Sequence, residues 1–112
     1  MTDSPWERVL SEIDRLHTAK QLDYGTDHDP YNNLRAGEPY NVPAWLHAHI
    51  MCQHKANRVQ SFVEKGSLEN EGVRDSLIDL AVYAIASVVL FDESHRGDVE
   101  AQPEHSPVDA VV

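Results

Sequence analysis

Two aspartates stand one helical turn apart in a segment that is otherwise suited to burial. Asp75 and Asp79 belong to the stretch DSLIDLAVYA, and the apolar residues continue to Phe91. Like charges four residues apart destabilise a helix by about 0.2–0.5 kcal/mol, so another group is expected to offset them. Mg²⁺ takes one or two carboxylates together with water and the phosphate oxygens of a substrate. The pair therefore predicts a magnesium site for a phosphorylated substrate, with Asp75 and Asp79 as metal ligands and catalytic groups.

Basic side chains on two other predicted helices are expected to lie beside the aspartates. Lys55 falls inside the apolar face of the second helix and Arg58 lies at its border, where both suit the charge of a phosphate. His17 and Lys20 continue the apolar stripe of the first helix. As simpler alternatives, His17 would be a histidine at the edge of the core, and Lys20 would extend past the stripe to reach water. The four residues predict a polar site inside a helical bundle, with Lys55 in catalysis and the others in substrate binding.

Both aspartates also have structural explanations. Asp75 lies in the first turn of the third predicted helix, where the helix dipole stabilises a carboxylate. Asp79 is able to form a buried ion pair with Lys55 or Arg58 that has no part in chemistry. Residue types and spacing leave the metal site and these structural roles open.

Three principal helices are predicted, which makes the fold all-α. The first spans about residues 5–21, with Ser4 as its N-cap and Glu7 completing a capping box. The second runs from about residue 43 to residue 65, where Gly66 supplies a stop. Apolar residues recur at helical spacing in both segments, so each is expected to bury one face.

The third helix is predicted over about residues 71–92, with Asn70 as its cap. Residues 23–42 between the first two helices have no periodicity and are expected to form a long functional loop. Residues 93–112 are acidic and poor in apolar side chains, so they predict a disordered tail beyond a single domain of residues 1–92. Because the third helix is apolar on nearly all sides, we expect a homo-oligomer, either a dimer or a tetramer.

Composition limits the classes of partner. The chain of 112 residues has a formal net charge of −10, which argues against sequence-independent binding of nucleic acid. No apolar run approaches the roughly 20 residues needed to span a bilayer, so no membrane contact is expected. The N-terminus carries no secretory signal, and the single cysteine, Cys52, fits a reducing compartment. We therefore expect a cytoplasmic protein.

The motifs resemble those of a known family. In order, LHTAKQLDYGTDHDPYNN, KANRVQSF and GSLENEGVRDSLIDLAVYA are similar to the small phage and actinobacterial proteins grouped as nucleotide modification associated, or DUF-type, domains. These are related to the MazG-like all-α nucleoside triphosphate pyrophosphohydrolases. The resemblance covers about residues 16–91 and implies a MazG-like helical bundle. By this resemblance the motif positions are His17, Lys20, Asp23, Tyr24, Gly25, Asp29, Asn32 or Asn33, Lys55, Arg58, Asp75, Asp79 and Tyr83. Among them the predicted substrate-binding residues are His17, Lys20, Asp23, Tyr24, Gly25, Asn32, Arg58 and Tyr83.

The resemblance implies a hydrolase, but one departure favours an alternative. MazG-like enzymes hold Mg²⁺ on an ExxE pair in one helix and an ExxD pair in a later one. Here the second helix has no acid before Glu64, and Ser76 stands where the later glutamate would fall. One prediction is a Mg²⁺-dependent deoxynucleoside triphosphate pyrophosphohydrolase. The alternatives are a non-catalytic module that binds a nucleotide, another phosphorylated small molecule or a host protein of a phage, and a helix that serves oligomerisation alone.

Overall fold

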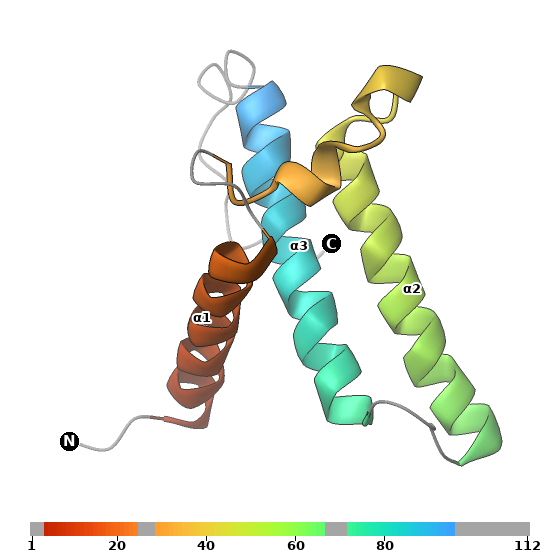
Figure 1. Cartoon of the computed structure of the whole chain (residues 1–112). Helices are drawn as coiled ribbons and strands as arrows, with labels where there is room; N and C mark the ends of the chain where they lie inside the picture. Colours follow the sequence, from red (N-terminus) through yellow and green to blue (C-terminus); the bar gives the residue numbers. More distant parts are fainter. Residues whose placement is uncertain (1–3, 25–28, 67–71, 96–112) are drawn as a thin grey trace, which may run out of the picture.

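Helices make up the fold. The computed structural model describes residues 4–24, 29–66 and 72–95, with the backbone alone for residues 19–24. In chain order its elements are α1 (Pro5–Tyr24), the 3₁₀ turns η1 (Asn32–Arg35) and η2 (Glu38–Tyr40), α2 (Ala44–Lys65) and α3 (Val73–Ser94) (Figure 1). The described part of the chain contains no strand, so the all-α prediction is confirmed.

The helix ends agree with the sequence signals at two places. The Glu7 N–H donates to the Ser4 hydroxyl at 3.1 Å, which is the expected capping contact at the start of α1. Gly66 ends α2 with a positive φ of 81°, and its N–H donates to the Phe62 carbonyl. Both signals depend on residues close in sequence, which is why the sequence alone places them.

Other helix ends differ from the prediction. The N-cap of α3 is Gly72, so Asn70, which lies outside the described residues, is not the cap. α3 also continues two residues past its predicted end at about residue 92, to Ser94. The Phe91 and His95 rings stack at 4.0 Å, and the His95 N–H donates to the Phe91 carbonyl, which adds contacts in the last turn. Residues 96–112 of the predicted tail lie outside the described residues.

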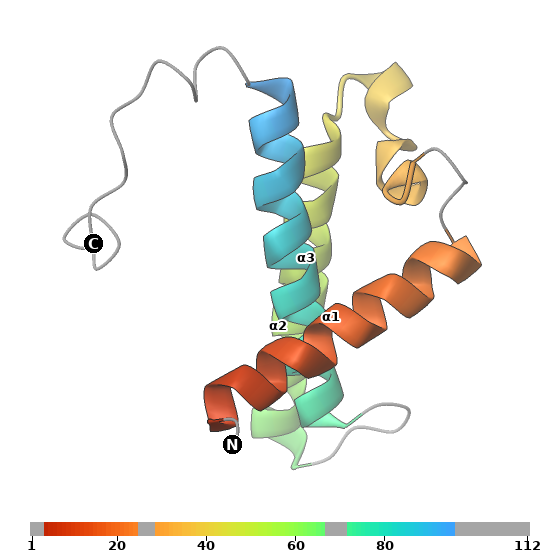
Figure 2. The same cartoon turned by 90° about the vertical axis from the view of Figure 1, so that its left-hand side faces the viewer.

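The core lies where α2 and α3 pack side by side in opposite directions (Figure 1). Ala44 and Ala48 of α2 meet Ala86 and Leu90 of α3, and all four are buried. Three of these four side chains are alanines, which allow the backbones of the two helices to approach closely. α1 crosses α3 obliquely and touches it over a short length (Figure 2).

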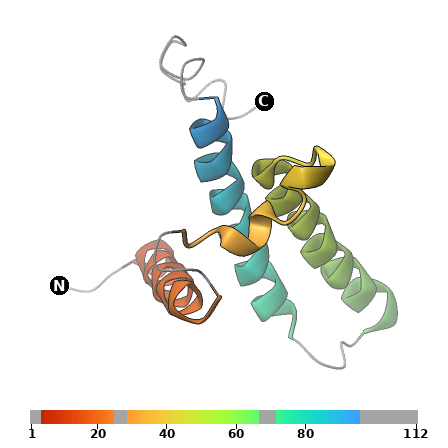
Figure 3. The same cartoon turned by 45° about the horizontal axis from the view of Figure 1, so that its top comes forward.

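The loop between α1 and α2 is fixed by polar contacts. The Arg35 guanidinium donates to the carboxylate of Asp29 in the same loop and, at 3.0 and 3.1 Å, to Glu93 near the end of α3. The His47 ring Nδ1 lies 3.1 Å from the Leu34 carbonyl, which ties the loop to α2. These contacts hold the 3₁₀ turns across the ends of α2 and α3 (Figure 3).

Large apolar side chains remain exposed on two helices. On α1 the exposed fraction is 72% for Trp6 and 42% for Leu10, and on α3 it is 50% for Leu77 and 60% for Val88. α3 is therefore covered by its own chain on one side, although its sequence is apolar almost all round. None of the described helices is long and apolar enough to span a membrane.

Candidate functional site

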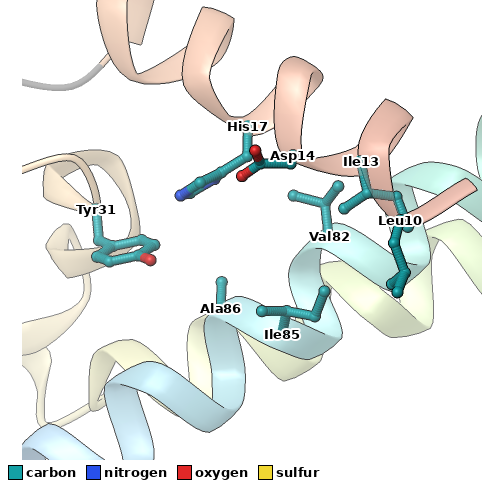
Figure 4. Close-up of a pocket in the computed structure, with 8 residues that line it drawn as sticks. All are labelled: Leu10, Ile13, Asp14, His17, Tyr31, Val82, Ile85 and Ala86. Carbon is teal, nitrogen blue, oxygen red and sulfur yellow. The ribbon is translucent and has the colours of Figure 1, made fainter. Parts of the chain in front are cut away.

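A small pocket opens where α1, the loop and α3 come together (Figure 4). Its volume is about 160 Å³, which is below the roughly 300–1,000 Å³ of sites that enclose a whole drug-sized ligand. The lining residues are Leu10, Ile13, Asp14, His17, Tyr31, Val82, Ile85 and Ala86. The space therefore suits one ring of a ligand whose remainder extends outside.

The polar end of the pocket is formed by α1 and the loop. His17 and Asp14 point from α1 into the space above Ala86, and Tyr31 faces them from the loop (Figure 4). The rings of His17 and Tyr31 stack at 5.7 Å with an interplanar angle of 27°. Burial, and then the nearby carboxylates, raise the pKa of Tyr31, so its phenol stays protonated at neutral pH. The two rings and one carboxylate provide a flat wall and hydrogen-bonding groups at this end.

An ion pair lies next to the pocket, in the contact between α2 and α3. Lys55 Nζ is 3.1 Å from Asp79 Oδ2, and the two side chains are 19% and 20% exposed. Asp79 precedes Val82, a pocket residue, by three positions, which is about 4.5 Å along the helix axis. This is the ion pair named as an alternative from the sequence, although each side chain is about one-fifth exposed, and neither residue lines the pocket itself.

Asp75 lies apart from this pair. Its side chain is exposed in the first turn of α3, and its carboxylate lies near Gly72 at the helix N-terminus. A carboxylate in that position stabilises the positive end of the helix dipole. The structural alternative for Asp75 therefore has a physical basis in the fold.

The described residues do not fit a Mg²⁺ site by themselves. Asp79 is bound by Lys55, whose charge competes with a metal ion for the same oxygen. Within residues 4–24, 29–66 and 72–95, no three His, Cys, Asp or Glu side chains gather closely enough to hold a metal. Ser76, at the position of the expected glutamate, is fully buried, and its hydroxyl has no hydrogen-bond partner among the described atoms. The ligand set of a metal would have to include groups other than these.

Three further predicted site residues have described positions. Arg58 is half-buried on α2, one turn after Lys55, and its Nε atom is shielded from solvent. Tyr83 is half-buried on α3, one turn after Asp79. Asn32 is exposed in η1, as is its neighbour Asn33. Arg58 and Tyr83 thus lie on the same helices as the ion pair, whereas Asn32 lies on the outer surface of the loop.

Four predicted residues cannot be placed. The side chains of Lys20, Asp23 and Tyr24 at the end of α1 lie outside the described residues, and so does Gly25. Their assignment to substrate binding stays a prediction.

Asp29, a position in the resembling motif, takes a structural part in the loop. Its carboxylate accepts hydrogen bonds from Arg35 and, at 3.0 Å, from the Tyr31 N–H. The bond from Arg35 lowers the pKa of Asp29. Hydrogen bonds to Glu93 and Asp29 in turn raise the pKa of Arg35 above its ordinary value. Asp29 therefore orients Tyr31, which lines the pocket, while its own carboxylate is engaged with Arg35.

No protein-family model, curated protein sequence or solved structure matches the chain. The family named from the motifs therefore stays a prediction.

Sequence reasoning missed two contributors to the site. Asp14 stands three residues before His17, on the same face of α1, and this spacing was the available signal. Arg35 holds the loop against Glu93, which is 58 residues away in sequence. No local sequence pattern predicts a contact between residues so far apart in the chain, so only the structure reveals the Arg35–Glu93 contact.

Proposed function

We propose that the chain binds a nucleotide or a similar phosphorylated small molecule, with one ring in the pocket and the phosphates toward Lys55. One observation carries this proposal: the Lys55–Asp79 ion pair lies about one turn of α3 from Val82, which lines the small apolar pocket. The pocket offers apolar walls and the stacked rings of His17 and Tyr31 to a planar group. Lys55 is one-fifth exposed, so it is reachable by an anion yet partly removed from water.

The roles of the polar groups follow from their charges. A phosphate would share Lys55 with Asp79, and Arg58 one turn away adds a second cation on the same helix. Asp14 repels a phosphate but accepts hydrogen bonds from the N–H groups of a base or the hydroxyls of a sugar. The ligand would therefore lie with its ring and sugar toward α1 and its phosphates toward α2.

Hydrolysis is the second candidate, because Asp75 and Asp79 stand one turn apart on α3 and the sequence resembles the MazG-like enzymes. Binding is preferred over hydrolysis because Asp79 is engaged by Lys55 and Asp75 is exposed. The two differ in one observable: a hydrolase releases product with Mg²⁺, whereas a binding module returns its ligand unchanged.

The experiment is calorimetric titration of the full chain with nucleoside triphosphates, nucleosides and inorganic phosphate, each with Mg²⁺ and with a chelator. We expect nucleotides to bind in both conditions, and Lys55→Gln to weaken nucleotide binding about tenfold or more while nucleosides are unaffected. Lys65→Gln, at the exposed end of α2, is the matched control. Chromatography of the same samples detects any product.

A second pair of variants tests the pocket. Tyr31→Ala removes one ring wall and is expected to weaken nucleosides and nucleotides alike. Tyr40→Ala, which removes a tyrosine that is 80% exposed, is expected to leave both unchanged. Absence of binding by every compound would refute the proposal, and turnover abolished by Asp79→Asn would replace it with the hydrolase.

A further inference from the structure

Apolar residues on one side of α3, all exposed except the half-buried Ala81, follow a seven-residue repeat. Leu77, Ala81, Ala84, Val88 and Phe91 are spaced by four, three, four and three positions. This is the spacing of a helix that packs along its length against another helix. Their exposure supports that reading, because Leu77 is 50%, Val88 60% and Phe91 39% exposed. We name these five residues the α3 seam.

The seam points away from the candidate site. Val88 and Asp79 are nine positions apart, which at 100° per residue places them on opposite sides of α3. Figure 2 shows α1 crossing α3 obliquely, with its N-terminal half on one side of the α2–α3 pair and its C-terminal end and the loop on the other. The α3 residues that line the pocket with α1 are Val82, Ile85 and Ala86, and none of them belongs to the seam. The seam is thus a second surface, independent of the pocket and of the function proposed for it.

Residues of α2 extend this surface and form one wall of a groove in it. A shallow groove with almost wholly apolar walls is lined by Trp45 and His49 of α2 and by Ser87, Val88 and Phe91 of α3. α3 has 22 residues and is about 33 Å long, and two helices side by side are about 20 Å wide. The resulting face, roughly 600 Å² in projection, is of the order of the ~800 Å² that each partner contributes to a stable dimer.

We propose that the α3 seam packs against the α3 seam of a second copy of this chain, with the two helices antiparallel. Arg74 and Asp92 are eighteen positions, or about five turns, apart and therefore lie on the same side of α3, next to the seam. Arg74 also donates to both carboxylate oxygens of Glu12 on α1 at 2.7 Å, and because its side chain is 63% exposed, an antiparallel pair would bring the Asp92 of the other copy near it as a second carboxylate. A parallel pair would instead place the acidic ends, with Asp92 and Glu93, beside each other and align the helix dipoles.

The side chains of the seam also fit this orientation. An antiparallel pair centred on Ala84 sets Leu77 opposite Phe91 of the other copy, since both are seven positions from the centre. Leu77 then enters the groove beside Val88 and Trp45, and the alanines at positions 81 and 84 let the two backbones approach. The two candidate pockets would face outward on opposite sides of the dimer, each complete within its own chain.

Sedimentation velocity over a concentration series tests the assembly. We expect a dimer whose dissociation constant rises at least about tenfold in Val88→Glu, because a charge would be buried in the seam. Asn57→Glu, on the exposed side of α2, is the matched control and should leave the dimer intact. Circular dichroism establishes that each variant is folded.

Oxidative cross-linking tests the orientation without depending on those variants. In a Cys52→Ala background, a mixture of Leu77→Cys and Phe91→Cys chains is expected to form a mixed disulfide dimer, while Leu77→Cys alone is not. A monomer at every concentration, or a dimer that Val88→Glu leaves unchanged, overturns the proposal. Self-cross-linking of Leu77→Cys without mixed dimers overturns the antiparallel orientation. Dimers that appear only after removal of residues 96–112 would show that the chain's own end covers the seam, which also overturns it.

Discussion

The two sides of α3 differ in what they contact. One side faces α1, the loop and α2, and carries the Lys55–Asp79 ion pair next to a small pocket. The other side carries Leu77 and Val88, which are half or more exposed. The polar groups are therefore sheltered and paired within one chain, whereas part of the apolar surface is not covered by it.

This difference explains why a helix that is apolar almost all round carries aspartates at all. Burial of α3 by its own chain is restricted to one side, and there Asp79 has a cation to compensate its charge. Asp75 needs no such partner, because it lies in water at the positive end of the helix. The apolar side is where association would bring the largest gain in buried surface.

The largest expected effect comes from truncating the side of α3 that faces α2. Leu90 is 2% exposed and packs against Ala44 and Ala48, so Leu90→Ala is expected to lower the free energy of unfolding by about 3 kcal/mol. Val88→Ala, at a position that is 60% exposed, is expected to cost less than about 1 kcal/mol in dilute solution. Urea denaturation of both variants provides the measurement.

Measurements at several protein concentrations distinguish the two sides of α3 further. The cost of Leu90→Ala is expected to be the same at all protein concentrations, since its contacts lie within one chain. The cost of Val88→Ala is expected to grow as concentration rises, because association stabilises the folded state by mass action. Equal costs for the two variants at every concentration would contradict the distinction between a covered and an open side.

The next effect concerns the ion pair. Lys55→Met removes the cation and leaves Asp79 one-fifth exposed without its partner at 3.1 Å, so we expect a loss of about 2 kcal/mol in unfolding free energy. Lys65→Met, at an exposed position on the same helix, is expected to change stability by less than about 0.5 kcal/mol.

A double-mutant cycle separates the pair from its surroundings. Adding Asp79→Asn to Lys55→Met should restore most of the lost stability, because the carboxylate charge that faced Lys55 is then removed as well. Strictly additive losses in the double variant would mean that the two residues act separately and that the sheltered cation is not held by Asp79.

The sequence predicted the helices because their signals are local. Apolar periodicity, the Ser4 cap and the Gly66 stop depend on residues within about one turn of each other, and the helices and helix ends that they predict are present. The buried face expected of α1 was wrong, because Trp6 and Leu10 remain exposed: α1 crosses α3 over a short length only. The end of α3 was placed two residues early because the last turn is supported by ring stacking of Phe91 and His95, which periodicity does not reveal.

The candidate site was predicted in part. Burial of Lys55 and Asp79 follows from their place on apolar helix faces, and their pairing was among the alternatives. The pocket was not predicted, because its shape depends on the oblique crossing of α1 and on how the loop is held. Arg35 fixes the position of the loop by its hydrogen bonds to Asp29 and Glu93. Contacts between distant parts of the chain cannot be recognised in a single sequence.

The smallest expected effect concerns the contact of Arg35 with Asp29, which fixes the loop on the pocket side of α3. Arg35→Gln removes the cation that binds Asp29, so we expect a loss of about 1 kcal/mol at neutral pH. The hydrogen bond from Arg35 lowers the pKa of Asp29 below its ordinary 3.8, so the native chain has extra stability above that pH. This contribution disappears as the pH falls through the lowered pKa of Asp29.

The stability difference between the native chain and Arg35→Gln should therefore be full at neutral pH and shrink below about pH 3.8. Arg35→Lys keeps the charge without the forked geometry that reaches Asp29 and Glu93 together, so it should recover part of the difference. Urea denaturation at a series of pH values measures all three chains. A difference that stays constant across this range would mean that Arg35 stabilises the loop by packing alone, and the pocket would then depend on the shape of the loop more than on its charges.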